Sequence, residues 1–171
     1  LWTRIVKPWL EMRKPYQIEH VAPERGNAAT LTISPVNHKG INFHPGQFAW
    51  ISVGANPYMD REHPFSIASS AEKPDQISFT IKNLGDFSST IPSLKSGEKV
   101  YLDGPYGSFS IDRHQHAKGF VFLAGGIGIT PFMSTLRTIR DRKDTRPVWL
   151  FYANNEWKDV TFREELESIQ S

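Results

Sequence analysis

Residues 119–143 read GFVFLAGGIGITPFMSTLRTIRDRK, an order typical of a strand, a glycine turn and a helix. The unbroken apolar run over 120–124 predicts a short strand covered on both faces. Thr130 is a good N-cap and Pro131 suits the first helical position, so the helix is expected to begin there. Its apolar face recurs at helical spacing and consists of Phe132, Leu136 and Ile139.

The glycines between this strand and helix leave room for a ligand. Gly125, Gly126 and Gly128 would present free backbone N–H groups at the positive end of the helix dipole. Without Cβ atoms, a phosphate can approach that backbone closely. The pattern is neither a P-loop nor a full GxGxxG, because Pro131 stands where the third glycine would be. From spacing alone, phosphate binding and a turn that only packs the helix on the sheet are both open.

Composition excludes several classes of function. The 171 residues carry a net charge of +2 and no cysteine. No basic run is interleaved with aromatics, so no nucleic-acid partner is expected. Disulfides, thiolate metal sites and iron–sulfur clusters within this chain are ruled out. The chain starts at Leu1 rather than Met, and we expect it to be a piece of a longer protein.

The first residues differ in character from the rest. Residues 1–15 place Trp2 and Trp9 beside Arg4 and Lys7, a mixture found at membrane–water interfaces. The segment is predicted to be an N-terminal arm. Proximity to a membrane and packing on its own domain are both open.

Residues 16–113 read as short strands separated by turn residues, which favours an antiparallel barrel or sandwich. The predicted strands are 17–22, 29–34, 47–53, 65–69, 77–82 and 99–102.

A polar boundary over 111–118 precedes the second unit, 118–171. His114 and His116 could share a strand face and hold a metal, but no third ligand is in view, so a solvated linker and no metal are expected. A second buried strand is predicted over 148–152. Thr161 and Glu164 form a predicted capping box. The apolar stripe of the helix that follows is Phe162, Leu166 and Ile169. Two strands leave edges and faces uncovered, so this domain is expected to be incomplete.

Residues 63–70 read HPFSIASS and make the organisation more specific. This segment resembles the flavin-binding strand of the ferredoxin–NADP reductase superfamily, which usually shows Arg-x-Tyr-Ser. The His-Pro-Phe-Ser/Thr version resembles the ferric reductase and NADPH oxidase branch. Further stretches resemble the family in the same order: FHPGQFAWI at 43–51, GDFSSTI at 85–91, GPYGSF at 104–109, LAGGIGITPFMS at 123–134 and NEWKDVTFREELE at 155–167.

The resemblance implies a six-stranded antiparallel Greek-key β-barrel that binds FAD, followed by the first part of an α/β parallel-sheet domain that binds NADH or NADPH. It implies that Ser66 is the catalytic residue, hydrogen-bonding the flavin near N5, and that Phe65 lies against the isoalloxazine. His63 would lie near the pyrophosphate, with Pro64 and Ile67 in the same cofactor-binding strand. Histidine carries a full charge only when protonated, so anchoring is expected to be weaker and more pH-dependent than with arginine.

Other cofactor contacts follow from the same resemblance. Lys82 is expected at the adenine half of FAD. Gly85, Phe87 and Ser88 match a GxxSxxL element whose short helix points at the FAD pyrophosphate, although an ordinary surface turn is the reading without the family. Asp86 is expected to turn outward or cap that helix. Pro92 should keep the helix short.

The glycine turn then becomes the nicotinamide cofactor's pyrophosphate site. It would consist of Gly125, Gly126, Gly128 and Thr130. The 2′-ribose position follows the second strand, where Asn154 and Asn155 stand with Lys158 as the one cation. NADP-binding members usually show more positive charge there, so NADH is favoured over NADPH.

The resemblance implies a flavoprotein reductase that moves a hydride from nicotinamide C4 to flavin N5. Its expected partner is a haem-containing transmembrane region, on the cytoplasmic side of a membrane, with haem or ferric iron as acceptor. An NADPH oxidase-like enzyme that delivers electrons to oxygen and a non-catalytic FAD-binding module are the alternatives.

Overall fold

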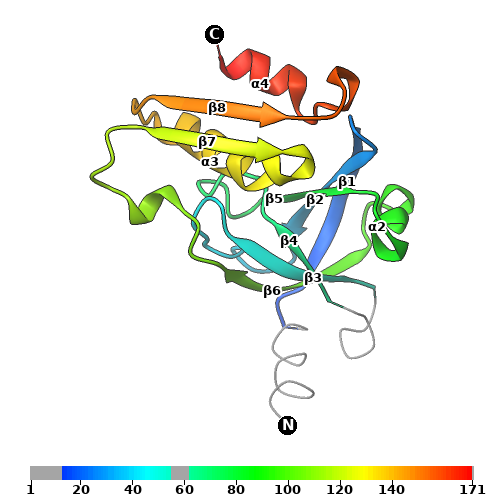
Figure 1. Cartoon of the computed structure of the whole chain (residues 1–171). Helices are drawn as coiled ribbons and strands as arrows, with labels where there is room; N and C mark the ends of the chain where they lie inside the picture. Colours follow the sequence, from blue (N-terminus) through cyan, green and yellow to red (C-terminus); the bar gives the residue numbers. More distant parts are fainter. Residues whose placement is uncertain (1–12, 55–61, 171) are drawn as a thin grey trace.

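The computed structural model describes residues 13–54 and 62–170. Six strands in the first part form one antiparallel sheet in the order β4-β3-β6-β1-β2-β5 (Figure 1). The strands are β1 (Tyr16–Glu24), β2 (Ala28–Pro35), β3 (Phe48–Val53), β4 (His63–Ser66), β5 (Ile77–Lys82) and β6 (Lys99–Tyr106). The prediction of a six-stranded antiparallel barrel is therefore confirmed.

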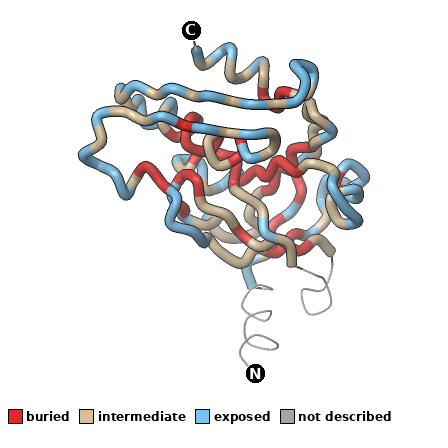
Figure 2. Tube along the Cα trace, viewed as in Figure 1, coloured by how far each residue is buried: buried red, intermediate tan, exposed pale blue. Residues whose placement is uncertain are grey.

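The sheet curls until its two edge strands meet. Ile67, just beyond β4, forms a bridge with Phe79 of β5. Because side chains alternate between the two faces of each strand, one face gathers the apolar residues inside the curl. Figure 2 shows many buried residues along these strands. Several of these side chains are fully buried: Leu31, Ile33, Ile51, Ile67, Ile77 and Phe79.

The strand predicted over 65–69 begins and ends earlier than expected. β4 pairs with β3 from His63, opposite Ile51, to Ser66, opposite Phe48. After Ser66 the chain leaves β3 and turns to β5, where the Ala68 N–H donates to the Ser78 carbonyl at 2.8 Å. Residues 67–69 thus close the barrel rather than extend β4.

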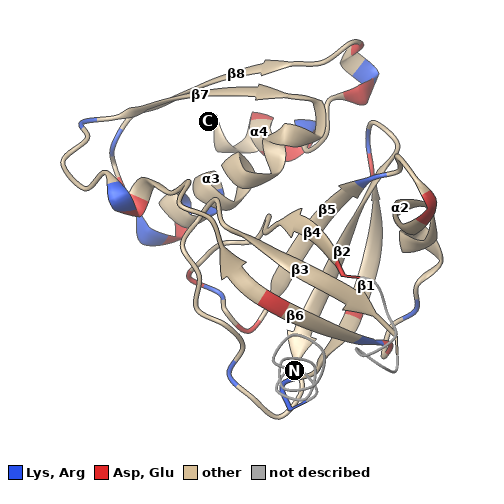
Figure 3. Ribbon diagram, turned by 60° about the horizontal axis from the view of Figure 1, so that its bottom comes forward, with Lys and Arg blue, Asp and Glu red and all other residues tan. Residues whose placement is uncertain are grey.

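The second part is a parallel pair of strands with two helices. β7 (Phe120–Gly125) pairs with β8 (Val148–Ala153), and α3 (Thr130–Arg142) connects them. α4 (Arg163–Ile169) follows β8. Both helices pack on the same face of the β7–β8 sheet, and α3 lies between that sheet and the barrel (Figure 3). The predicted start of a parallel α/β sheet is confirmed.

The expectation that β7 and β8 are covered on both faces is wrong for the described residues. Phe122 and Leu150 face the helices and pack in the second core. The opposite face stays exposed, since no described element packs over it. Its large side chains are Val121, Leu123, Trp149 and Phe151, between 56% and 72% exposed.

Both predicted helix starts are also corrected. A 3₁₀ turn, Gly126–Ile129, precedes α3, so Ile129 is the N-cap and Thr130 is already helical. α4 starts at Arg163 after Phe162, which has a left-handed φ of 61°, so Thr161 and Glu164 form no capping box. Their side chains instead reach the β1–β2 hairpin.

That hairpin docks the second part on the barrel. The Thr161 hydroxyl donates to the Arg25 carbonyl at 3.2 Å, and Arg25 donates to the Glu164 carboxylate. Gly26 has a φ of +73°, and a Cβ built there would lie 2.6 Å from the Asp159 carbonyl oxygen. Glycine is therefore required here both by the turn and by the contact.

Candidate functional site

β4 and α2 (Asp86–Thr90) bring three flat rings together. His63 stacks on Phe87 with ring centroids 3.9 Å apart and planes 16° from parallel. Phe65, two residues along the same strand, stacks on Phe87 at 5.9 Å. All three rings are half-buried, which leaves part of each surface in contact with solvent. Such a cluster is suited to contact with another planar ring system.

The other predicted residues of β4 divide between solvent and core. Pro64 is exposed and Ser66, at the end of the strand, is half-buried. Ile67 is fully buried and belongs to the barrel core. Lys82 is the last residue of β5, opposite Ala28. The structure thus gathers His63, Phe65 and Phe87, and leaves Ile67 a packing role.

Ser88 stabilises its own turn. Its hydroxyl accepts from the N–H groups of Leu84 and Gly85, both at 2.9 Å, and donates to the Gly85 carbonyl at 3.0 Å. Asp86 is the first residue of α2 and is exposed, in agreement with the expectation that it turns outward. Pro92 lies in the 3₁₀ turn that replaces α2 after Thr90, so the helix is short as predicted.

The glycine turn before α3 faces open space. A Cβ built at Gly125, Gly126 or Gly128 would meet no atom within 4 Å, and the same is true of Gly85. Gly126 has a φ of +48°, which favours glycine on its own account. Gly125 has extended backbone angles that any residue can adopt. Neither its conformation nor its packing against the described residues therefore requires glycine. Both turns therefore leave open space beside the backbone, which a ligand could approach closely.

Two neighbours hold the glycine turn in place. The Tyr152 hydroxyl at the end of β8 donates to the Gly126 carbonyl at 3.0 Å. Thr130 is buried, and its hydroxyl donates to the Ile127 carbonyl at 3.1 Å. The Thr130 hydroxyl thus points back into the turn that it was expected to share with the cofactor.

Past β8, the cation expected near the ribose is already paired. Lys158 Nζ lies 2.8 Å from Glu156 Oε2. The side-chain nitrogen Nδ2 of Asn154 is buried without a hydrogen-bond partner. Neither feature supplies free positive charge for a 2′-phosphate.

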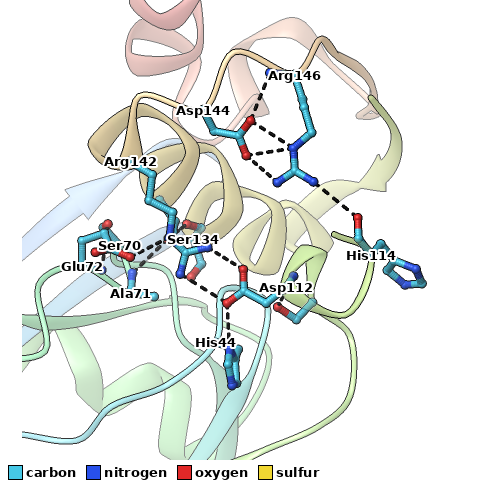
Figure 4. A network of polar contacts seen from close by, with 12 residues as sticks. His44, Ser70, Ala71, Glu72, Asp112, His114, Ser134, Arg142, Asp144 and Arg146 are labelled. Carbon is cyan, nitrogen blue, oxygen red and sulfur yellow. Dashed lines mark hydrogen bonds and ion pairs between the residues drawn. The ribbon is translucent and has the colours of Figure 1, made fainter. Parts of the chain in front are cut away.

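A charged junction that sequence reasoning missed lies where α3 ends (Figure 4). Arg142 donates to Asp112 of the linker at 2.5 Å and to Glu72 of the barrel at 2.6 Å. His44 Nδ1 lies 2.7 Å from the same Asp112 carboxylate. Burial works against the ionised carboxylate, but hydrogen bonds from Arg142 and His44 outweigh it and lower the pKa of Asp112. No local pattern marks these residues, because they lie far apart in sequence.

The linker histidines carry no comparable structure. His114 and His116 are both exposed. Across 13–54 and 62–170, no three His, Asp or Glu side chains are grouped closely enough to hold a metal ion. None of the helices in those same ranges combines the length and apolar character needed to span a bilayer.

Comparison with known families identifies both parts. The family described as FAD-binding domain matches residues 15–110, more than half of the chain. The chain belongs to this FAD-binding family. The family described as oxidoreductase NAD-binding domain matches residues 122–171. Together the two matches support FAD and NAD(P)H as the cofactors of this chain.

Individual relatives share this architecture. The chain is 29% identical over 153 residues to the reductase component of propane 2-monooxygenase from Mycolicibacterium smegmatis, covering 88% of this chain and 43% of that protein. It is 30% identical to the toluate 1,2-dioxygenase electron transfer component of Pseudomonas putida, covering 89% and 44%. The chain thus spans less than half the length of these curated relatives.

A solved structure supports the fold alone. The flavohaem-like FAD/NAD-binding domain of nitric oxide dioxygenase from Vibrio cholerae superposes with a TM-score of 0.79 at 21% identity, covering 91% of this chain and 68% of that one.

Proposed function

We propose that this chain is the electron-transfer part of an NAD(P)H-dependent flavoprotein reductase. The observation that supports this is a direct contact between the two parts of the chain. α3 begins at the open glycine turn, and its Ser134 hydroxyl donates to the carbonyl of Ser69, in the segment that follows β4, at 2.8 Å. When bound, FAD would supply the redox chemistry, namely acceptance of a hydride from NAD(P)H and release of single electrons. Ser66 would supply a hydroxyl that can donate or accept at that atom. His63, Phe65 and Phe87 would contact the cofactor rings and pyrophosphate.

The test is anaerobic mixing of the full-length, FAD-loaded protein with NADH or NADPH. Loss of the oxidised-flavin absorbance is expected. We infer from the paired Lys158 that NADH has the higher kcat/KM. A flavin that stays oxidised with both nucleotides would leave a non-catalytic FAD-binding module. Faster turnover with NADPH would contradict the nucleotide preference alone.

For the acceptor, we propose haem or ferric iron, because residues 63–66 read HPFS, as in the ferric reductase branch. A second candidate is an oxygenase component, favoured because two curated relatives are named as an oxygenase reductase component and a dioxygenase electron transfer component. Steady-state NADH oxidation with ferric citrate as acceptor should exceed the rate with oxygen alone. Full activity with oxygen alone would instead support an NADPH oxidase-like enzyme.

We also propose a position on the cytoplasmic side of a membrane, next to a haem-bearing transmembrane region. The support is the mixture of Trp2 and Trp9 with Arg4 and Lys7, which lies outside the described residues. Fractionation of cells that make the full-length protein tests this. Recovery entirely in the high-speed supernatant would contradict it.

A further inference from the structure

One face of α3 is polar and bonds to main chain rather than to water. Three side chains spaced i, i+3 and i+4, hence adjacent on the helix surface, contact the segment that follows β4. The contacts are Ser134 Oγ to Ser69 O at 2.8 Å, Arg137 Nη1 to Ala68 O at 2.8 Å, and Ala71 N to Thr138 Oγ1 at 2.9 Å. Ser134 and Thr138 are fully buried, so this is a dry contact.

The same segment is held from its other side by the barrel. The Ala68 N–H donates to the Ser78 carbonyl of β5 at 2.8 Å, and Ile67 bridges Phe79. Ala68 is therefore fixed by both backbone groups, with its N–H on the barrel and its C=O on α3. It lies two residues after Ser66, so its position constrains where Ser66 stands.

Arg137 is itself held in a defined geometry. Its Nε and Nη2 donate to the two carboxylate oxygens of Glu165 in α4 at 2.8 Å and 2.5 Å. The guanidinium lies 5.1 Å from the centre of the Phe162 ring, and the side chain is only 16% exposed. Burial opposes ionisation of Glu165, but the hydrogen bonds from Arg137 prevail and lower its pKa. A planar fork can hold this carboxylate and the Ala68 carbonyl together, whereas a lysine ammonium lacks that geometry.

α3 begins at Thr130, directly after the glycine turn. Arg137 lies seven residues further, about 10 Å along the helix axis. We propose that Arg137 is a positioning residue: through the Ala68 carbonyl it sets the distance and orientation between Ser66 at the flavin and the glycine turn at the nicotinamide cofactor. This inference rests on the proposed function for its catalytic consequence, but the fixing of Ala68 can be measured without it.

The first measurement uses single-turnover reduction of the full-length, FAD-loaded protein. Arg137→Lys is expected to slow the limiting rate of flavin reduction by about ten- to a hundred-fold, because a small misplacement of reacting groups is costly. The dissociation constants of FAD and NAD(P)H should change by less than about three-fold, because no ligand contact is removed. Arg140→Lys is the matched control: Arg140 is half-exposed on the same helix, and its ion pairs with Asp141 at 3.3 Å and Glu165 at 3.8 Å need only the positive charge that lysine keeps, so the rate should be unchanged.

The second measurement is amide hydrogen exchange over 67–71 in the absence of nucleotide. Exchange at Ala68 and Ala71 should accelerate by about ten-fold in Arg137→Lys and stay unchanged in Arg140→Lys. If the wild-type flavin is not reduced by either nucleotide, the proposed function fails, yet this exchange still tests the placement of Ala68. Unchanged exchange would overturn the inference, as would a rate loss matched by an equal loss of FAD binding.

Glu165→Gln covers the case in which Arg137→Lys does not fold. This variant keeps Arg137 and its contact with the Ala68 carbonyl, but it weakens the paired hydrogen bonds from Arg137 to residue 165 that orient the guanidinium. A smaller rate loss is expected, and the double variant should be no slower than Arg137→Lys alone. A Glu165→Gln protein with wild-type rate and exchange would overturn the inference.

Discussion

Ser66 is the half-buried last residue of β4, and two rings of the same strand, His63 and Phe65, stack on Phe87 of α2. Ser66→Ala should slow flavin reduction by about ten- to a hundred-fold, because the hydroxyl is the group expected at N5. FAD binding should weaken by less than about three-fold, since most contacts with so large a cofactor remain. Stopped-flow reduction and FAD titration measure the two effects. Ser89→Ala in α2 is the control, and equal kinetics for both variants would remove Ser66 from the site.

Gly125 and Gly26 make a contrasting pair. Alanine at Gly125 would meet no protein atom, so the free energy of unfolding should stay the same or rise by up to about 1 kcal/mol. NAD(P)H should bind about ten-fold more weakly, because the methyl group takes the space that a phosphate needs. Isothermal titration and thermal unfolding report the two quantities.

Alanine at Gly26 should do the reverse. There the φ of +73° and the Asp159 carbonyl 2.6 Å from a built Cβ predict a loss of about 1–3 kcal/mol. Nucleotide affinity of the folded fraction should be kept. Weakened binding in Gly26→Ala without loss of stability would mean that the two turns have been assigned the wrong roles.

At the scale of elements, the C-terminus of α3 is attached to the linker by the Arg142–Asp112 pair. Asp112→Asn should lower the free energy of unfolding at pH 7 by about 1–3 kcal/mol, because Arg142 loses one of its two carboxylate partners. The pKa of Asp112 is lowered in the folded state, so its contribution is present above the ordinary carboxyl pKa and is lost as the pH falls through the lower folded value. The difference from wild type should therefore shrink below about pH 4.

Urea unfolding at a series of pH values checks this. Asp75→Asn, an exposed aspartate before β5, is the matched control and should show a much smaller difference. A constant difference between Asp112→Asn and wild type from pH 3 to pH 7 would contradict the ion-pair explanation.

The sequence predicted the elements well where local chemistry decides them. The alternation of apolar and polar residues predicted β2 and β5, and the glycines predicted the turn between β7 and α3. The start of α4 was missed for a tertiary reason. Thr161 and Glu164 have the spacing of a capping box, but the hairpin at Arg25 offers both of them partners. The capping-box pattern considers only neighbouring residues, so it cannot predict that a hairpin distant in sequence will bind the same side chains.

The site was predictable in part for the same reason. The glycine turn could be recognised from its local spacing, whereas the HPFS segment was singled out by its resemblance to a known family. The polar face of α3 at Ser134, Arg137 and Thr138 could not, since periodicity alone makes it look like a solvated surface. It is buried because residues 68–71 offer unpaired backbone groups, which sequence patterns do not show.

At the scale of the molecule, a two-stranded parallel sheet is a weak platform for a dinucleotide. Residues 1–171 alone are expected to bind NAD(P)H much more weakly than the full-length protein, because the crevice of such folds is formed by further strands. Fluorescence titration of both proteins measures the ratio. Equal dissociation constants would show that β7, β8 and their helices suffice, and would contradict this prediction.

The outer face of β7 and β8 carries a consequence for the behaviour of the isolated chain in solution. Leu123 and Phe151 stand side by side there, opposite one another in the ladder and mostly exposed. A contiguous exposed apolar patch of this kind promotes self-association of the protein and binds hydrophobic dyes. The apparent molar mass of residues 1–171 from light scattering should rise with protein concentration. That of a Leu123→Lys, Phe151→Glu variant should stay at the monomer value.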